Sequence, residues 1–376
     1  MPSAANFAAR ADVANAHRVV VKIGSSSLTG DDGHLDHLAL SGLVDVLAEL
    51  RGAGREVVLV TSGSIAAGIG PLGLARRPRD LEMQQATASV GQGILIGAYS
   101  AAFARHGLRV GQVLLTADDL VRRTHYGNAQ RALHRLLDLG VVPVVNENDT
   151  VATDEIRFGD NDRLAALVAI VVHADAVVLL TDIDGLYTAA PDSPGARRVA
   201  VVSSPTELEG IDITRRGSAI GTGGMVTKLE AAAISTSSGM PVVLTSATLA
   251  RAALTGEDVG TIFLATGKRN GSRLAWLAYA ARTSGQLVLD QGAVRAVRTG
   301  KASLLAAGVS GVRGEFEAGD PIDLVAPDGS VVARGLASFA AHEIPAMLGL
   351  STVQLRDQLG PHFARELVNI DDLVVV

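Results

Sequence analysis

Short apolar runs alternate with stretches of helical spacing along most of the chain. Where apolar residues recur every three or four positions, as over residues 40–50, the pattern predicts an amphipathic helix. Continuous apolar runs that alternate with such helices are typical of a parallel sheet covered by helices on both faces. The predicted strands span residues 18–23, 57–60, 110–115, 141–145, 176–180 and 241–244.

Helices are predicted in several of the stretches between these strands. One of them contains Gly91, Gly93 and Gly97, which are expected to be its weak points because glycine disfavours a helix interior. The other long helices end at a glycine or shortly before the next strand. The predicted helices span residues 84–105, 128–139, 162–173 and 225–238.

The pattern changes near Arg282, where short strands with glycine-rich turns replace the long alternation. Asp328 and Gly329 form a turn signal between two of these strands. We therefore predict an open, mainly parallel α/β domain over residues 17–281, followed by a small β-rich domain. An irregular N-terminal extension is predicted over residues 1–16, and a connection begins at residue 268. The β-rich domain is predicted over residues 282–368, with strands at 286–289, 311–314, 321–325 and 330–334. A C-terminal tail is predicted over residues 369–376.

Composition narrows the possible functions. The chain has 376 residues, enough for two domains, and 48% of them are hydrophobic, enough for a large core. A net charge of −6 gives no support to general binding of polyanions. The absence of cysteine excludes disulfides, thiolate metal sites and a cysteine nucleophile. No apolar run is long enough to span a membrane, and residues 1–17 lack the core of a secretory signal, so a cytoplasmic location is expected.

Polar side chains gather where the predicted strands end. Lys22 and residues 24–27 belong to the first strand end, residues 62–64 to the second, residues 146–149 to the fourth, and Thr181 with Asp182 to the fifth. In an open parallel α/β sheet, ligands bind beyond the carboxyl ends of the strands. This coincidence of four strand ends predicts a ligand site there.

Several of these clusters suit a phosphate. The glycine and serines at residues 24–27 can present backbone N–H groups to an anion, although an ordinary strand-to-helix turn has the same composition. Lys22 lies in an apolar strand, where an unpaired ammonium is costly, so it is either paired with a phosphate or placed on an edge strand. The glycine-rich segment 221–228 leads into a predicted helix that contains Lys228, and it does not match a Walker A loop. It either binds phosphates through its backbone N–H groups or is a surface loop.

The acidic and amide groups at residues 146–149 and 159–162 are too many for helix capping alone. The small residues at 61–68 allow a ligand to approach closely, or else serve tight helix packing. Acidic residues at 182 and 184 favour a nucleotide contact over a metal. The histidines form no metal-like pair with acidic residues at helical spacing, and His125 and Tyr126 are interpreted as structural.

Six segments carry a resemblance to a known family, and they follow that family's order. They are VKIGSSS at residues 21–27, TSGSIAAG at 61–68, NENDT at 146–150, FGDND at 158–162, LTDIDGLY at 180–187 and GTGGMVTK at 221–228. Together they resemble the glutamate 5-kinase family of amino-acid kinases, and the segment 146–162 is the most specific part. LDQGA at 289–293, KASLL at 301–305 and GVRGEF at 311–316 resemble a PUA domain.

This resemblance implies ATP-dependent phosphorylation of the γ-carboxylate of L-glutamate, the first step of proline biosynthesis. It also implies Mg²⁺ as cofactor, feedback inhibition by proline and a homo-oligomer, dimer or tetramer, with metal ligands left unassigned. Implied catalytic residues are Lys22, Lys228 and Asp162, the last orienting the two lysines. Implied glutamate-binding residues are Ser62, Asp149 and Asn161. Implied ATP-binding residues are Lys22, Gly24, Ser25, Thr181, Asp182, Thr222, Gly223, Gly224, Met225, Val226, Thr227 and Lys228.

Two alternatives stay open at this stage. Another amino-acid kinase would act on N-acetylglutamate or carbamate, and Asp149 argues against it because those substrates lack a charged α-amino group. An RNA-binding or RNA-modifying protein is suggested by the PUA-like segment, and the acidic net charge and the complete set of kinase motifs argue against that as the main activity. The PUA-like domain would then serve regulation or assembly.

Overall fold

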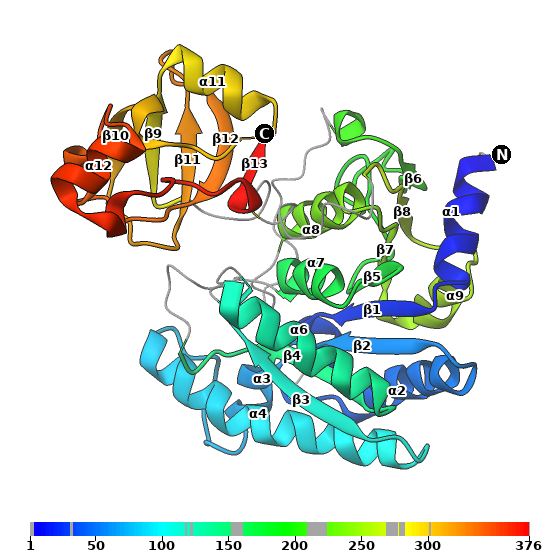
Figure 1. Ribbon diagram of the computed structural model, residues 1–376. Helices are drawn as coiled ribbons and strands as arrows, with labels where there is room; N and C mark the ends of the chain where they lie inside the picture. The colour runs from blue at the N-terminus through cyan, green and yellow to red at the C-terminus, as the bar shows by residue number, and fades with distance from the viewer. Residues whose placement is uncertain are drawn as a thin grey trace. The chain divides into compact units, whose positions relative to one another are not determined.

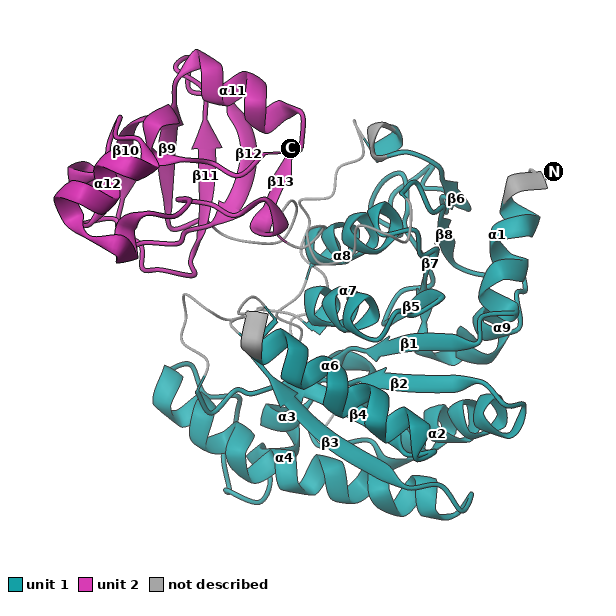
Figure 2. Ribbon diagram, viewed as in Figure 1, with its two compact units in different colours: residues 1–270 teal, residues 271–376 magenta. Residues whose placement is uncertain are grey.

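The computed structural model describes residues 4–30, 33–116, 119–120, 123–151, 161–208, 224–267, 277, 283–300 and 302–375. The chain forms two compact units, residues 1–270 and residues 271–376 (Figure 2). The domain boundary predicted at residues 281–282, like the predicted connection over residues 268–272, falls outside the described residues.

A mainly parallel sheet forms the centre of the first unit. In the described residues it has eight strands in the order β3-β4-β2-β1-β5-β7-β8-β6. Each neighbouring pair is parallel except β7 with β8. The strands are β1 Arg18–Ile23, β2 Glu56–Val60, β3 Val110–Leu115, β4 Val142–Glu147, β5 Ala176–Thr181, β6 Val201–Val202, β7 Val242–Ser246 and β8 Thr261–Phe263.

Helices cover both faces of this sheet, as predicted (Figure 1). Helices α6, α7 and α8 pack side by side on one face, while α2, α4 and α9 pack on the other. The helices are α1 Ala4–Ala14, α2 His37–Gly52, α3 Ser64–Ile69, α4 Leu81–Ala104, α6 Arg123–Asp138, α7 Asn161–Val171, α8 Met225–Ser237 and α9 Ala250–Leu254. The 3-10 turns of this unit are η1 Ser25–Leu28, η2 Pro205–Leu208 and η3 Ala247–Leu249.

The central strands are apolar because both faces of the sheet are covered. Every residue of β4 and β5 is buried, and so is all of β1 after Arg18. Lys22 is therefore a central-strand residue and not an edge-strand lysine, since β1 lies between β2 and β5. Strand β4 also runs two residues further than predicted and includes Asn146 and Glu147.

The N-terminal segment was predicted to be irregular, and that prediction was wrong. Residues 4–14 form α1, in which Val13 and Arg10 are buried. The Arg10 guanidinium donates to the carbonyls of Glu257 and Val259, at 3.0 and 2.7 Å, and pairs with Asp258 at 3.0 Å. Polar side chains thus attach this helix to the segment that follows α9.

The second unit contains a five-stranded sheet in the order β10-β9-β11-β12-β13. Its buried residues include Leu287, Leu324 and Phe339, which form a hydrophobic core of its own. Residues 369–376 were predicted to be a tail, but β13 pairs with β12 and completes the sheet. The elements are β9 Gly285–Leu289, α11 Gln291–Arg298, η5 Ala306–Gly308, β10 Val309–Gly314, β11 Pro321–Val325, β12 Val331–Leu336, η6 Ile344–Ala346, α12 Thr352–Leu359, η7 Pro361–Phe363, η8 Ile370–Asp372 and β13 Leu373–Val375.

Among the described residues, no helix combines the length and apolar character needed to cross a bilayer.

Candidate active site

The four polar strand ends predicted from the sequence lie on neighbouring strands. Strands β4, β2, β1 and β5 are consecutive in the sheet and parallel, so their carboxyl ends meet at one edge. The first turn of α7 adds Asn161 and Asp162 to this edge, and both are buried. The structure thus brings together most of the residues that the sequence selected.

A carboxylate between two lysines forms the charged part of the site. Lys22 Nζ lies 2.7 Å from Asp162 Oδ1, and Lys228 Nζ lies 3.0 Å from Asp162 Oδ2. The side chain of Asp162 is 0% exposed and those of the lysines are 1% and 8% exposed. Thr227 Oγ1 donates to Asp162 Oδ2 at 3.1 Å. Because an anion is favoured at a helix N-terminus, the start of α7 also stabilises this carboxylate.

The two ammonium groups and one carboxylate leave a formal excess of one positive charge in a buried place. Two lysines placed together in this way suit a phosphate, which accepts charge-assisted hydrogen bonds from ammonium groups. Gly24 lies beside this group, since a Cβ at this position would be in van der Waals contact with Lys22 Nζ, at 3.7 Å.

The turn after β1 offers fewer backbone donors than the sequence suggested. The N–H of Gly24 donates to Leu180 O at 3.2 Å, and the N–H of Ser27 donates to Gly24 O at 3.2 Å. The N–H groups of Ser25 and Ser26 open the 3-10 turn η1, and the first amides of a helical turn have no partner within it. These two amides are the donors that the turn can direct at an anion.

Hydroxyl and amide groups form the polar part of the site, centred on Asn161. Its Nδ2 donates to Thr61 O at 2.6 Å, to Asn146 Oδ1 at 2.7 Å and to Ser62 Oγ at 3.1 Å. Thr61, Asn146 and Asn161 are all buried, and Ser62 is half-buried. The end of β2, the end of β4 and the start of α7 are therefore joined through one side chain.

Asp149 is held by Ser64, which lies in the predicted strand-end cluster 62–64 but was assigned no binding role. Ser64 Oγ donates to Asp149 Oδ2 at 2.7 Å, and Ser64 itself is buried. Ser64 begins α3 directly after Gly63, whose φ of 103° lies in the left-handed region that glycine tolerates. The serine is thereby aimed from a tight turn at the carboxylate.

Helix α4 passes beneath this turn and adds two further polar residues that the sequence missed. Gln92 Oε1 accepts from Asn146 Nδ2 at 2.7 Å. The hydroxyl of Tyr99 lies 2.8 Å from Thr61 Oγ1, and its burial raises the pKa of the phenol. The only sign of Gln92 in the sequence is a polar residue between two glycines, which is also common on a helix surface.

The expected nucleotide residues lie at the ends of β5 and α8. Thr181 is buried and donates to Asp182 Oδ1 at 2.9 Å, while Asp182 is exposed. Helix α8 begins at Met225 after Gly224, and the side chain of Val226 is 42% exposed. The N–H groups of its first turn, including that of Thr227, are suited to a phosphate. Thr222 and Gly223 lie outside the described residues.

A protein-built metal cage is not found in the part of the chain that the structure describes, since no group of three or more His, Cys, Asp or Glu side chains there could hold a metal ion. Mg²⁺ usually uses one or two carboxylates together with substrate phosphates. The exposed carboxylate of Asp182 beside the proposed nucleotide residues fits that mode. His125, predicted to be structural, lies 3.0 Å from Asp119.

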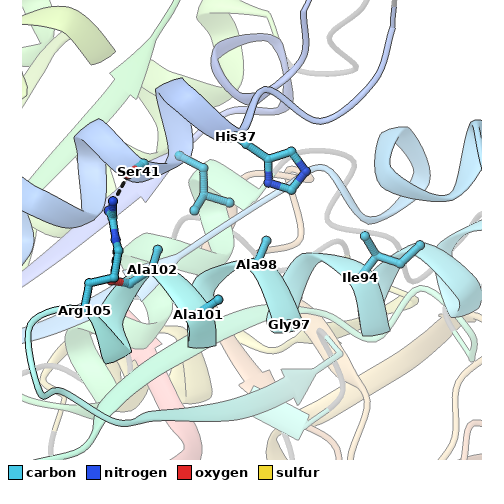
Figure 3. A pocket seen from close by; sticks show the side chains of 9 residues that line it. His37, Ser41, Ile94, Gly97, Ala98, Ala101, Ala102 and Arg105 are labelled. Carbon is cyan, nitrogen blue, oxygen red and sulfur yellow. Dashed lines mark hydrogen bonds between the residues drawn. The ribbon is translucent and has the colours of Figure 1, made fainter.

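A cavity of about 380 Å³ opens elsewhere, between α2 and α4. Figure 3 shows His37 and Ser41 facing the small residues Gly97, Ala98 and Ala101 across it. None of the site residues predicted from the sequence lines this cavity, so it is separate from the strand-end site.

The sequence and the fold have counterparts among known proteins. Residues 17–246 match the amino acid kinase family model, and residues 285–359 match the PUA domain model. The structure of carbamate kinase from Giardia lamblia bound to AMP-PNP superposes with a TM-score of 0.50 over 67% of this chain and 100% of that one. Its sequence identity is 18%, so this likeness shows the fold alone. The class is thus an amino-acid kinase with a PUA domain.

Full-length relatives narrow that class. The glutamate 5-kinase of Streptomyces coelicolor is 59% identical over 369 residues, covering 98% of this chain and 99% of the relative. The glutamate 5-kinases of Salinispora arenicola and Thermobifida fusca are 60% and 58% identical, with 97% and 98% of this chain covered and 99% and 95% of the relatives. The chain belongs to the glutamate 5-kinase family.

Proposed function

We propose that the protein transfers the γ-phosphoryl group of ATP to the γ-carboxylate of free L-glutamate and forms L-glutamyl 5-phosphate, at the start of proline biosynthesis. The observation that carries this proposal is the first turn of α7. Asn161 of this turn joins the polar group of Ser62 and Asn146, while the next residue, Asp162, holds the two buried lysines. A polar substrate site and a positively charged site therefore adjoin.

Recognition of free glutamate requires groups for its ammonium and its carboxylates. The carboxylate of Asp149 suits an ammonium, because carboxylate oxygens accept charge-assisted hydrogen bonds from its N–H groups. The Ser62 hydroxyl accepts from Asn161 and keeps its own hydrogen for a substrate oxygen. An N-acetyl group or carbamate offers no positive charge to Asp149, which supports free glutamate as the substrate.

The transfer forms a bond between a γ-carboxylate oxygen and the γ-phosphorus as the bond from that phosphorus to the ADP oxygen breaks. The electron pair of the broken bond stays on ADP. A carboxylate is already ionised at neutral pH, so the reaction needs no general base, which agrees with a site built without histidine. What it needs is positioning and positive charge. Lys22 and Lys228 supply that charge, and Asp162 keeps both ammonium groups in place. Mg²⁺, when bound with the nucleotide, would neutralise further phosphate charge.

The substrate assignment is tested by ATP-dependent formation of hydroxamate from glutamate, N-acetylglutamate and aspartate. We expect activity with glutamate and little with the other two. Activity with N-acetylglutamate alone would overturn the assignment, and no activity with any of them would overturn the proposed function.

Lys228 is predicted to act on the transferred group and not on glutamate binding. Replacing it by alanine should lower kcat by at least about a hundredfold, the scale expected when one electrostatic interaction with developing charge is removed, with a much smaller change in glutamate KM. Arg251→Ala is the control, since that side chain is 54% exposed on α9 and pairs with Glu49. An unchanged kcat in Lys228→Ala would exclude this role.

Five further expectations from the sequence and the family resemblance stay predictions. They are the use of Mg²⁺, inhibition by proline, assembly into a dimer or tetramer, a cytoplasmic location, and a PUA domain that serves regulation or assembly in place of RNA binding as its main role.

A further inference from the structure

We infer that Gln92, on α4, is a positioning residue that helps to hold the Asn161 amide with its Oδ1 toward the substrate. The inference rests on the proposed function and adds to it a chain of three amides that runs from α4 to the site. Gln92 accepts from Asn146, and Asn146 accepts from Asn161. Only the last member of the chain is expected to touch glutamate.

Two backbone groups fix the direction of this chain. The Oδ1 of Asn146 accepts from the N–H of Glu147 at 2.9 Å, and a backbone N–H can only donate. The Nδ2 of Asn146 must then point the other way, toward Gln92 Oε1 at 2.7 Å. At the far end, the carbonyl of Thr61 can only accept, so the atom of Asn161 that lies 2.6 Å from it must be Nδ2. Reversing any of the amides would set two donors or two acceptors against each other.

This orientation has a chemical consequence for Asn161. Its Nδ2 carries two hydrogens and already has three acceptors within 3.1 Å, namely Thr61 O, Asn146 Oδ1 and Ser62 Oγ. Nδ2 is therefore saturated. Among the described residues, Asn161 Oδ1 accepts no hydrogen bond from the protein, so it is the atom that the side chain can offer to a ligand.

A carbonyl oxygen that faces a ligand site recognises a donor and repels a carboxylate. Together with the carboxylate of Asp149, Asn161 Oδ1 gives two acceptors, which match the several N–H donors of an ammonium group. Charge-assisted hydrogen bonds of this kind are about twice as strong as neutral ones. The relay from Gln92 thus contributes to selecting a free α-amino group.

Removing the acceptor at Gln92 would leave Asn146 Nδ2 without its partner and loosen the Asn146 amide, which the N–H of Glu147 alone would then hold in direction. Asn161 Nδ2 would keep Thr61 O and Ser62 Oγ as acceptors, but the support from Asn146 Oδ1 would weaken. The effect should fall on glutamate binding, because the charged trio around Asp162 makes no hydrogen bond to Gln92 or Asn146 in the described residues. Removal of one hydrogen bond from a half-buried polar network corresponds to roughly a tenfold change in an equilibrium constant.

The test compares Gln92→Met, which has a similar length but a much weaker acceptor, with Gln92→Glu, which keeps the acceptor. In the ATP-dependent hydroxamate assay we expect Gln92→Met to raise glutamate KM by about tenfold and to leave ATP KM within about twofold. Gln92→Glu should stay within about threefold of wild type in both. Gln84→Met is the matched control, because Gln84 lies on the same helix and donates to Arg79 O at 3.1 Å.

The outcomes separate the two proposals. Wild-type protein that does not act on glutamate would overturn the proposed function. If the wild type is active, three results would overturn the positioning role alone. They are an unchanged glutamate KM in Gln92→Met, equal changes in glutamate KM and ATP KM in that variant, and a Gln92→Glu variant that is impaired as much as Gln92→Met. Should Gln92→Met not fold, Gln92→Ala removes the same acceptor with a smaller side chain and carries the same expectation.

Discussion

Replacing Asp162 by asparagine tests whether the buried charges are held together as the geometry indicates. The substitution keeps the shape of the side chain and removes a negative charge that faces Lys22 and Lys228 at 2.7 and 3.0 Å. Two ammonium groups would then remain buried with less compensation. We expect a large loss in the free energy of unfolding of the first unit.

The size of this loss follows from burial. All three side chains are at most 8% exposed, so water cannot take over the role of the missing carboxylate. Breaking a buried pair by removing one partner costs about 3–5 kcal/mol. A matched comparison lies next to it, because Arg163 Nε donates to Glu230 Oε2 at 2.6 Å and this pair also links α7 to α8. Those side chains are 23% and 35% exposed, so Glu230→Gln should cost only about 0–1 kcal/mol.

Urea unfolding followed by circular dichroism measures both variants, and native-state hydrogen exchange of amides in β1, β5 and α7 assigns the loss to the first unit. The hydrogen-exchange comparison matters because a chain with two compact units need not unfold in one transition. A loss for Asp162→Asn no greater than that for Glu230→Gln would refute the reasoning that the trio is a buried, mutually dependent group of charges.

Two further predictions concern backbone packing and pH. Gly91→Ala should lower the melting temperature by several degrees, because a Cβ there would lie 1.8 Å from Ser64 O. A Cβ at Gly93 would meet nothing within 4 Å, so Gly93→Ala should stabilise the protein by up to about 1 kcal/mol. Equal melting temperatures of the two variants would contradict this. Partial desolvation, assisted by a neighbouring histidine and arginine, lowers the pKa of His173, so the unfolded chain takes up its proton at higher pH and stability falls slightly as pH drops below about 6.5. His173→Asn, which suits the φ of 53° at this position, should lose less stability than wild type between pH 7.5 and 5.5, and parallel losses would exclude the effect.

The central sheet could be predicted from the sequence because its strands are apolar throughout. Elements with too few residues to show a pattern, or with polar residues on their buried side, could not be predicted. Strands β6 and β8 have two and three residues, too few to show a period. Helix α1 buries Asn6 and Arg10, so its inner face does not read as apolar. Arg10 can be buried because it pairs with Asp258, a residue far along the chain. A local sequence pattern does not show such a distant partner.

The site divides in the same way. Lys22, Ser62, Asp149 and Thr181 were found because they follow or end buried strands of one parallel sheet, a position with a physical reason to bind ligands. Gln92 and Tyr99 were not found, since a polar residue on a long helix is usually solvated. They lie seven positions apart, about two turns, and therefore on the same side of α4, but only the packed structure shows that this side faces β2 and β4.

The first turn of α7 explains why substrate recognition and charge compensation remain separable although they are adjacent. Successive helical residues point about 100° apart, so Asn161 turns to the ends of β2 and β4 while Asp162 turns to β1 and α8. Under the proposed function, α7 sets a fixed distance between the glutamate γ-carboxylate, which is the nucleophile, and the lysine charges that stabilise the phosphoryl group. An in-line transfer needs such fixed positions. Yet each side chain is supported by different neighbours, the amide by Asn146 and Gln92 and the carboxylate by Lys22 and Lys228. Substitutions of Asn146 or Gln92 should therefore change glutamate KM, and substitutions of Lys22 or Lys228 should change kcat. The two effects stay separate because Asn161 and Asp162, although adjacent on one helix turn, face different neighbours.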